Sequence, residues 1–500
     1  MEGLSERNER KRYEEAKKKQ RRNRIIAAIM AVLLAAGVVV YAVDSQINRN
    51  YNAYQVEKKF ERKDSNTVRY ISYDGRILKY SRDGISELDD SGKVVWTSTY
   101  DMKNPSVAYC GNYVAVADIG GKEICIYNRT NSTDIKKIEV VLPVMKIDIA
   151  EQGVVAVVLE DTDSSQINIY DPYNVSEQLL VSIPTNVETD GFPVDISISN
   201  DGERLVTDFI NISNGQAQTS INFYNFDEVG KNSINRIVGA RDFEQTVVPK
   251  TTFLNNETVC AYTETGFSLY EMKEIPKDIY EEQFDKAIKS IFSNEQYVGI
   301  ILDNNKKVEN YNNTEESDKS NTSSETKEST EETDTSKEDE NTSDKSTEET
   351  DTSKEDENAS DKSTEETNTS NEDGEETKTE ENKSADKEKD SKAQDTEIVK
   401  AEKKTKENEE GKKYQLKIYN LKGKKILDTN IDYEYDTVVM GKEEIIFSSN
   451  LECYILRING TEKFHYTFDN NIEYFLRSVS KNHYYVVDNN EISKIKLIIK

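Results

Sequence analysis

Apolar and polar residues follow three distinct patterns along this chain. In the first, residues 25–43 form a largely apolar run that contains no charged side chain. As an α-helix this run is about 28 Å long, close to the hydrocarbon thickness of a bilayer. It predicts one transmembrane helix, through which the chain contacts the lipid bilayer. A cleaved signal peptide has a shorter apolar core and a small-x-small site. The longer run, ending in Val39–Asp44, favours an uncleaved anchor.

The charges that flank the apolar run predict its orientation. Residues 1–24 contain ten Lys/Arg and five Glu, whereas residues 44–65 form a less basic flank. Positive residues next to a span remain on the cytoplasmic side. We therefore expect a basic cytoplasmic tail (1–24), a span (25–43) and a short, partly helical stalk (44–65). The expected location is the cell membrane, single-pass, with residues 44–500 extracytoplasmic.

The second pattern covers residues 66–307 and 413–500. Short apolar or alternating runs are separated there by Asn, Asp and Gly, which is typical of strands and turns. Several runs end in a tyrosine, and these tyrosines lie 43, 54, 46 and 149 residues apart: Tyr127, Tyr170, Tyr224, Tyr270 and Tyr419. Without the 105 residues of 308–412, the last interval is 44. A period of about 40–45 residues with four strands each predicts a β-propeller.

The predicted fold class is all-β, a β-propeller of seven or eight four-stranded blades. Residues 66–307 form its first part and 413–500 its last blades, and a stacked β-sandwich array is the alternative. The last unit, 474–498, lacks a fourth strand, so residues 66–72 are expected to supply it and close the ring. The recurring tyrosines are expected to pack between blades. The alternative is a ring of tyrosines that stack on sugars or peptides at the funnel mouth.

The third pattern is an acidic low-complexity insert, residues 308–412. It holds 37 Asp/Glu against 16 Lys and includes two nearly identical 17-residue copies at 329–345 and 346–362. Such a segment buries too little apolar surface to fold, so we expect disorder. The whole chain has a net charge of −29. This charge argues against nucleic-acid binding, which needs a basic surface.

Residue types that carry chemistry are few and scattered. Cys110 and Cys125 could pair across neighbouring strands, but scattered buried thiols are the favoured interpretation for all four cysteines. No cysteine or histidine spacing is typical of zinc, and His465 and His483 are expected to be structural. The runs 303–305 and 488–490 read as hairpin turns because they lack the spacing of a calcium loop. No catalytic, cofactor-binding or metal-binding residue is assigned, and no cofactor is expected.

Residues 74–96 carry the most regular blade sequence. Their Asp90, Gly92, Lys93 and Trp96 resemble the Asp-x-x-Gly-Lys turn and closing Trp of quinoprotein-type blades. That resemblance implies quinone-dependent dehydrogenation, which a single Trp and the lack of a vicinal Cys pair disfavour. The complete layout resembles a family of single-pass, membrane-anchored β-propeller proteins of Gram-positive bacteria with WD40-like blades. That family has no established activity, so the resemblance implies no catalytic residue.

These patterns favour a binding protein over an enzyme. The expected function is a non-catalytic binding or scaffold module for a protein or cell-envelope partner on the propeller face. One alternative is an enzyme that acts on envelope glycans with a carboxylate pair in the funnel, the arrangement that glycoside hydrolysis uses. The other is a sensor that signals ligand binding through the span.

Overall fold

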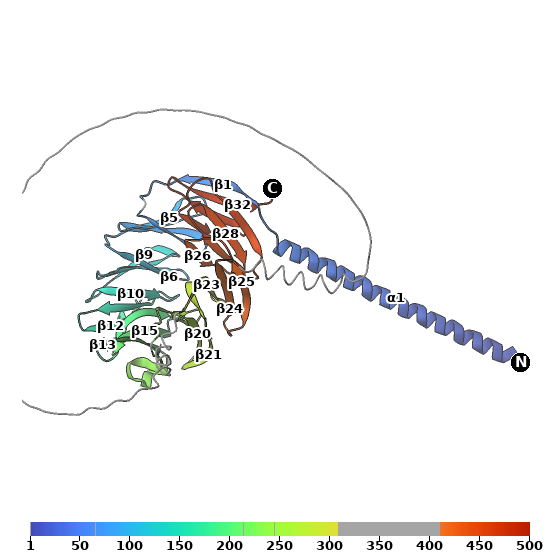
Figure 1. The fold of residues 1–500 in the computed structure, drawn as a ribbon, viewed down its shortest axis with the longest axis horizontal. Helices are drawn as coiled ribbons and strands as arrows, with labels where there is room; N and C mark the ends of the chain where they lie inside the picture. Colours follow the sequence, from blue (N-terminus) through green and yellow to red (C-terminus); the bar gives the residue numbers. More distant parts are fainter. Residues whose placement is uncertain (1, 66, 214, 245, 309–410) are drawn as a thin grey trace, which may run out of the picture. The chain divides into compact units, whose positions relative to one another are not determined.

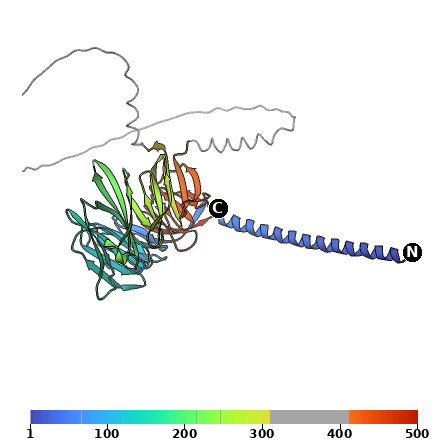
Figure 2. The ribbon, with the colours of Figure 1, turned by 90° about the horizontal axis from the view of Figure 1, so that it is seen from below.

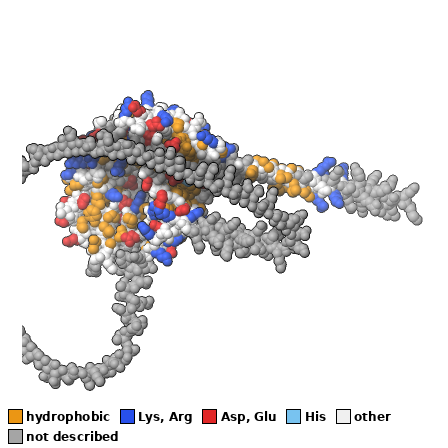
Figure 3. All heavy atoms as spheres, turned by 45° about the horizontal axis from the view of Figure 1, so that its top comes forward, with side chains coloured by type: hydrophobic (Ala, Val, Ile, Leu, Met, Phe, Trp, Pro, Cys, Tyr) orange, Lys and Arg blue, Asp and Glu red, His pale blue; other side chains and the backbone are white. Residues whose placement is uncertain are grey.

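The first element of the computed structural model is the helix α1 (Glu2–Ile47). The structure describes residues 2–65, 67–213, 215–244, 246–308 and 411–500. Within α1, the window Lys17–Val39 is long and apolar enough to cross a membrane, and none of it is buried. Figure 3 shows a band of apolar side chains along α1 beside a group of Lys and Arg. The predicted span therefore lies on a helix of the required length and composition.

The strands of the described residues form eight antiparallel four-stranded sheets, the blades of a propeller (Figures 1 and 2). Blade 1 contains β2 (Arg69–Tyr73), β3 (Arg76–Tyr80), β4 (Gly84–Leu88) and β5 (Val94–Thr99). Blade 2 contains β6 (Pro105–Cys110), β7 (Tyr113–Asp118), β8 (Glu123–Asn128) and β9 (Asn131–Glu139). Blade 3 contains β10 (Val144–Ile149), β11 (Val155–Glu160), β12 (Ser164–Tyr170) and β13 (Leu179–Asn186). Blade 4 contains β14 (Phe192–Ile198), β15 (Arg204–Ser213), β16 (Gln216–Asn225) and β17 (Ile237–Phe243), with the 3-10 helices η1 (Gly230–Asn232) and η2 (Ile234–Arg236) before β17.

The second half of the ring repeats this order. Blade 5 contains β18 (Lys250–Phe253), β19 (Thr258–Tyr262), β20 (Gly266–Met272) and β21 (Pro276–Gln283). Blade 6 contains β22 (Lys286–Ser293), β23 (Tyr297–Lys307), β24 (Tyr414–Asn420) and β25 (Lys425–Ile431). Blade 7 contains β26 (Thr437–Met440), β27 (Glu444–Ser448), β28 (Glu452–Arg457) and β29 (Glu462–Thr467). Blade 8 contains β30 (Tyr474–Arg477), β31 (His483–Val487), β32 (Glu491–Ile498) and β1 (Ala53–Glu61). The predicted propeller is confirmed, with eight blades.

The strand that closes the ring is β1, which lies beside β32 (Figure 1). It pairs with β32 from Ala53↔Ile498 to Glu61↔Glu491. The prediction that residues 66–72 close the ring is wrong, because β2 begins blade 1 instead. The expected stalk, 44–65, likewise contains β1. Six of the nine side chains of β1 are exposed and four are charged, since an outer strand packs on few neighbours. That pattern is hard to tell from a solvated stalk.

The antiparallel blades give the propeller two different faces. The turns between first and second strands meet at one face, where neighbouring blades bond to each other: Glu151 N donates to Asn200 O (2.8 Å) and Val479 N to Gly75 O (3.0 Å). Turns between third and fourth strands share this face. The chain enters β1, a fourth strand, at the same face, which we call the entry face. The C-terminus lies there too, because Lys500 N donates to Asn52 Oδ1 (2.9 Å; Figure 2).

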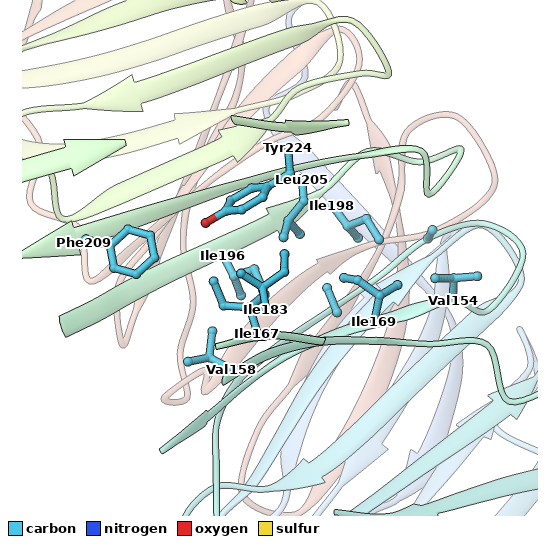
Figure 4. Close-up of a cluster of buried hydrophobic side chains, with 12 residues drawn as sticks. Val154, Val158, Ile167, Ile169, Ile183, Ile196, Ile198, Leu205, Phe209 and Tyr224 are labelled. Carbon is cyan, nitrogen blue, oxygen red and sulfur yellow. The ribbon is translucent and has the colours of Figure 1, made fainter. Parts of the chain in front are cut away.

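The hydrophobic core lies between blades. The predicted tyrosines end the third strands of blades 2 to 6, and each packs in a cluster shared with the preceding blade. Trp96 of blade 1, for example, stacks on Tyr127 of blade 2, with ring centroids 5.2 Å apart. Figure 4 shows Tyr224 and Leu205 of blade 4 facing Ile169 and Ile183 of blade 3. The packing interpretation of these tyrosines is confirmed.

The quinoprotein-like turn is formed one residue earlier than predicted. Asp89, rather than Asp90, holds the turn, because its Oδ1 accepts the amides of Ser91 (2.7 Å) and Lys93 (3.0 Å). Asp90 instead contacts blade 8, where it accepts hydrogen bonds from Tyr485 and Lys494. The predicted hairpin turn at 488–490 is present, since Asp488 Oδ1 accepts Asn490 N (2.7 Å). Residues 303–305 continue the strand β23, so that turn prediction is wrong.

The acidic insert interrupts the hairpin of β23 and β24 in blade 6, and its predicted disorder lies outside the described residues. The flanking strands pair in register from Tyr297↔Asn420 to Asp303↔Tyr414. Asn304 N also donates to Lys413 O (3.0 Å). Because loop closure costs little more for a long loop than for a medium one, a short Gly-Ser linker in place of 309–410 should change the Tm by about 2 °C or less. Calorimetry tests this, and loss of the cooperative transition would contradict it.

Candidate functional site

The cysteines and histidines, the residues most often used in sites, are dispersed in the structure. All four cysteines are free thiols, which agrees with the favoured interpretation of scattered thiols. Burial raises the pKa of the Cys125 thiol to about 11, so it stays protonated. His465 contacts Glu452 (2.8 Å) and His483 contacts Glu57 (3.2 Å). Among the described residues, no group of three or more His, Cys, Asp or Glu is placed to hold a metal.

A pocket of about 500 Å³ opens on the entry face, where blades 6, 7 and 8 meet. Its wall is built from turns of these three blades and from the segment that connects α1 to β1. The lining residues are Tyr51, Gln296, Tyr297, Lys442, Glu443, Glu444, Arg457, Ile458, Asn459, Lys463, Lys481 and Asn482. Four of these side chains are cationic and two are carboxylates. The pocket thus carries a positive excess in a chain whose net charge is −29.

A buried ion pair forms the floor of this pocket. Lys463 Nζ contacts Glu444 Oε2 at 2.6 Å, and both side chains are less than 10% exposed. Tyr484 joins the pair: its hydroxyl donates to Glu444 and accepts from Lys463 Nζ (2.8 Å). Burial lowers the pKa of Lys463, whereas Glu444 opposes this shift. The carboxylate of Glu444 is therefore bound by both the Lys463 ammonium and the Tyr484 hydroxyl.

Arg457 is the second buried cation of the pocket, and it forms no ion pair with a carboxylate of the described residues. Only 8% of the residue is exposed. Its Nη1 donates to Glu462 O (2.6 Å) and Nη2 donates to the carbonyl of Arg49. Burial lowers the pKa of its guanidinium, and the charge of Glu444 offsets this shift only in part. A buried charge without a directly paired counter-charge is costly, so this guanidinium can accept an anion.

The connection between α1 and β1 is fixed to the wall of the pocket. Tyr51 N donates to Lys463 O (2.9 Å), and the Tyr51 hydroxyl accepts from Asn482 Nδ2 (2.8 Å). Asn50 Nδ2 donates to Glu462 Oε1 (3.1 Å). The remaining amide oxygen of Asn482 is buried and has no partner among the described residues. The pocket and the start of the propeller are therefore one structural unit.

A second polar group lies in the first and second strands of blades 3 and 4. Asp148 on β10 accepts Ile198 N (2.9 Å) and Ser197 Oγ (3.2 Å), yet burial still raises its pKa to about 6. Asp208 on β15 is fully buried, and neither of its oxygens has a partner in the described part of the chain. Burial raises its pKa well above the usual value. The negative charge of Asp195 raises the pKa of both Asp148 and Asp208. Asp195 itself forms an ion pair with Lys146 (3.2 Å).

Replacing Asp208 by Asn is expected to stabilise the protein at alkaline pH. A raised pKa means that the folded state retains a proton which the unfolded state releases above about pH 4. The wild type therefore loses stability as pH rises above 4 toward the folded pKa, and Asn removes this loss. We expect D208N to raise the Tm by about 2–4 °C at pH 8 and little at pH 4.5. D163N, at an exposed turn of blade 3, is the matched control and should show no such gain. An equal effect of D208N at both pH values would contradict this.

The sequence contained weak signals for the pocket. Glu444 begins the strand β27, where a charged residue precedes an apolar run, and Lys463 occupies the corresponding place in β29. A charge at a buried strand position implies a buried partner. The partner of Glu444 lies 19 residues away in the chain, on a strand that β28 separates from β27. Asp208 gave a comparable signal, since it is a charged residue in the buried strand β15.

Solved structures with the same overall character share little sequence with this chain. BamB from Moraxella catarrhalis is 8% identical, with 89% of this chain and 98% of that chain covered and a TM-score of 0.42. The β-propeller domain of Cps50 (Swd1) from Myceliophteria thermophila is 11% identical, with 50% and 84% covered and a TM-score of 0.35. No curated protein matches the chain.

The match to a protein family is more extensive. The model of a family of unknown function, DUF5711, aligns with residues 47–341 and 368–497. These ranges include all eight blades and the closing strand β1. The chain therefore belongs to the DUF5711 family.

Proposed function

We propose that this protein is a membrane-anchored, extracytoplasmic β-propeller that acts as a non-catalytic binding or scaffold module for a protein or cell-envelope partner. The observation that carries the proposal is the direct connection of an apolar helix to a closed ring. Residues Lys17–Val39 have the length and hydropathy of a membrane span. The helix α1 ends at Ile47, and β1 already begins at Ala53. Such a short connection keeps the entry face near the membrane surface.

The charge distribution supports the proposed orientation. Lys17, Lys18 and Lys19, together with Arg21, Arg22 and Arg24, precede the apolar part of α1 (Figure 3). Basic residues in that position favour a cytoplasmic N-terminus. The resemblance to membrane-anchored propellers of Gram-positive bacteria adds to this proposal. The apolar side chains of a propeller are buried between its blades, as in the clusters described above. Its faces, with any pocket on them, remain available to bind partners.

Protease accessibility in intact Gram-positive cells tests the location. Epitope tags at the N-terminus and after Lys500 are followed after external protease treatment, with a cytoplasmic protein as the control for lysis. We expect the full-length chain in the membrane fraction, its C-terminal tag removed and its N-terminal tag protected. A protected C-terminal tag with an accessible N-terminal tag would overturn the orientation. A secreted product lacking the N-terminal tag would overturn the anchor in favour of a signal peptide.

In vivo cross-linking tests the binding role. Protein or wall material cross-linked to the wild type should be absent when the propeller is unfolded by removal of β1. It should persist when the acidic insert is replaced by a short linker. Cross-linking that is the same for folded and unfolded chains would contradict a specific binding face.

A further inference from the structure

We propose that the entry-face pocket binds a small organic anion, which competes with the Arg49 carbonyl for the guanidinium of Arg457. The binding itself depends only on the pocket. Its consequence for the α1–β1 connection deepens the proposed function and rests on it.

The cationic groups of the pocket are only partly neutralised by the protein. Lys463 is paired with Glu444, whereas the partners of Arg457 in the described part of the chain are carbonyl and hydroxyl oxygens. Lys481 lies 4.0 Å from Glu443 on the exposed rim, where an ion pair is weak. Lys442, also on the rim, forms no ion pair with another described residue. Arg457, Lys442 and Lys481 therefore face one cavity with a net unmet positive charge.

The chemistry of the remaining wall narrows the ligand class. Asn482 presents a buried amide oxygen without a partner, which can accept from a hydroxyl or N–H group. Asn482 is also one of four non-glycine residues with a positive φ in the described chain (60°), a conformation that costs free energy and often occurs at ligand sites. A volume of about 500 Å³ lies in the range of small-molecule sites. The ligand thus combines a carboxylate or phosphate with a hydroxyl or amino group, as in a hydroxy acid or a sugar phosphate.

Binding at this place would alter the connection to the helix. The guanidinium of Arg457 donates to the carbonyl of Arg49, two residues after α1 ends. A carboxylate or phosphate is a stronger acceptor for a guanidinium than a carbonyl, because it carries a full negative charge and can accept two parallel N–H bonds from one Arg side chain. An anion on Arg457 therefore weakens the attachment of residues 48–51 to blade 7. The same coupling makes the state of the connection affect ligand affinity.

Thermal unfolding of the purified full-length chain in detergent tests the binding step. The probes are citrate and glycerol phosphate, compared with sodium chloride at equal ionic strength and with neutral glucose. We expect a saturable rise in Tm of about 2 °C or more with at least one of the two anions at about ten times its Kd. The double variant K442E/K481E changes two exposed side chains and should abolish the rise. K250E, a single exposed lysine on blade 5, is the control and should retain it.

The outcomes separate this inference from the proposed function. No saturable rise with either anion, or an equal rise in K442E/K481E and K250E, overturns the anion site. Hydrogen exchange measures the second step: the anion should increase exchange in a peptide covering residues 48–52, with no increase in R457K/K442E/K481E. Binding without any change in that peptide overturns the competition with Arg49. None of these measurements depends on which side of the membrane the propeller occupies.

Discussion

Removal of residues 1–61 is expected to abolish cooperative unfolding of the propeller, whereas removal of residues 1–47 preserves it. The larger truncation deletes β1 and leaves the edge of β32 uncovered along its pairing from Ala53↔Ile498 to Glu61↔Glu491. Unpaired edges of this length recruit other chains and aggregate. The Tm of any residual transition should fall by more than about 10 °C, since many core and hydrogen-bonding contributions are lost together.

Contacts just beyond β1 add to this effect and provide a graded control. Arg62 is buried, pairs with Glu473 (2.6 Å) and donates to Asp488 O (2.7 Å). Its guanidinium also lies 5.2 Å from the centroid of Tyr70 in blade 1. R62M should therefore destabilise the ring less than loss of the strand, but in the same direction. Calorimetry and light scattering on the two truncated chains and on R62M measure how strongly each change destabilises the ring. A two-state transition near the wild-type Tm without residues 1–61 would show that β1 does not close the ring.

The architecture was predictable because each blade repeats one pattern that packing between blades requires. Tyr127, Tyr224 and Tyr419 recur since each fills the same buried place against the preceding blade. Leaving residues 308–412 out of the count restored the regular spacing of these tyrosines, which placed the insert inside one repeat. The closing strand escaped prediction because β1 is an outer strand. Its charged side chains lack the buried alternation of the inner strands.

The pocket was less predictable, for reasons of distance along the chain. Tyr51, Gln296 and Lys442 meet in space although hundreds of residues separate the first from the others. No local motif encodes such a site, because its residues come from turns of blades 6, 7 and 8 and from the α1–β1 connection. The charged residues in otherwise apolar strands were visible, but the identity of their partners required the three-dimensional arrangement of the strands. The same limit applied to Asp148 and Asp208, which belong to neighbouring blades.

Replacing Glu444 by Gln should be the most damaging single substitution at the pocket. It removes the carboxylate that contacts Lys463 (2.6 Å) and leaves the ammonium buried without a counter-charge. Loss of one partner of a buried pair costs about 3–5 kcal/mol. K463M alone should cost less than E444Q if Arg477, 3.6 Å from Glu444, still balances the carboxylate. The double variant E444Q/K463M should recover much of the lost stability, because it leaves neither charge alone.

The pH dependence of E444Q distinguishes an uncompensated charge from a simple packing defect. Burial already lowers the pKa of Lys463 in the wild type, and loss of Glu444 lowers it further. The folded state then binds fewer protons than the unfolded state between this lowered pKa and about 10.4. Stability of E444Q should therefore rise with pH across that window, with the full penalty present below it. Urea unfolding between pH 6 and pH 9.5 measures this slope. A constant difference between E444Q and the wild type, also kept in E444Q/K463M, would mean that the ion pair does not stabilise the protein at this pocket.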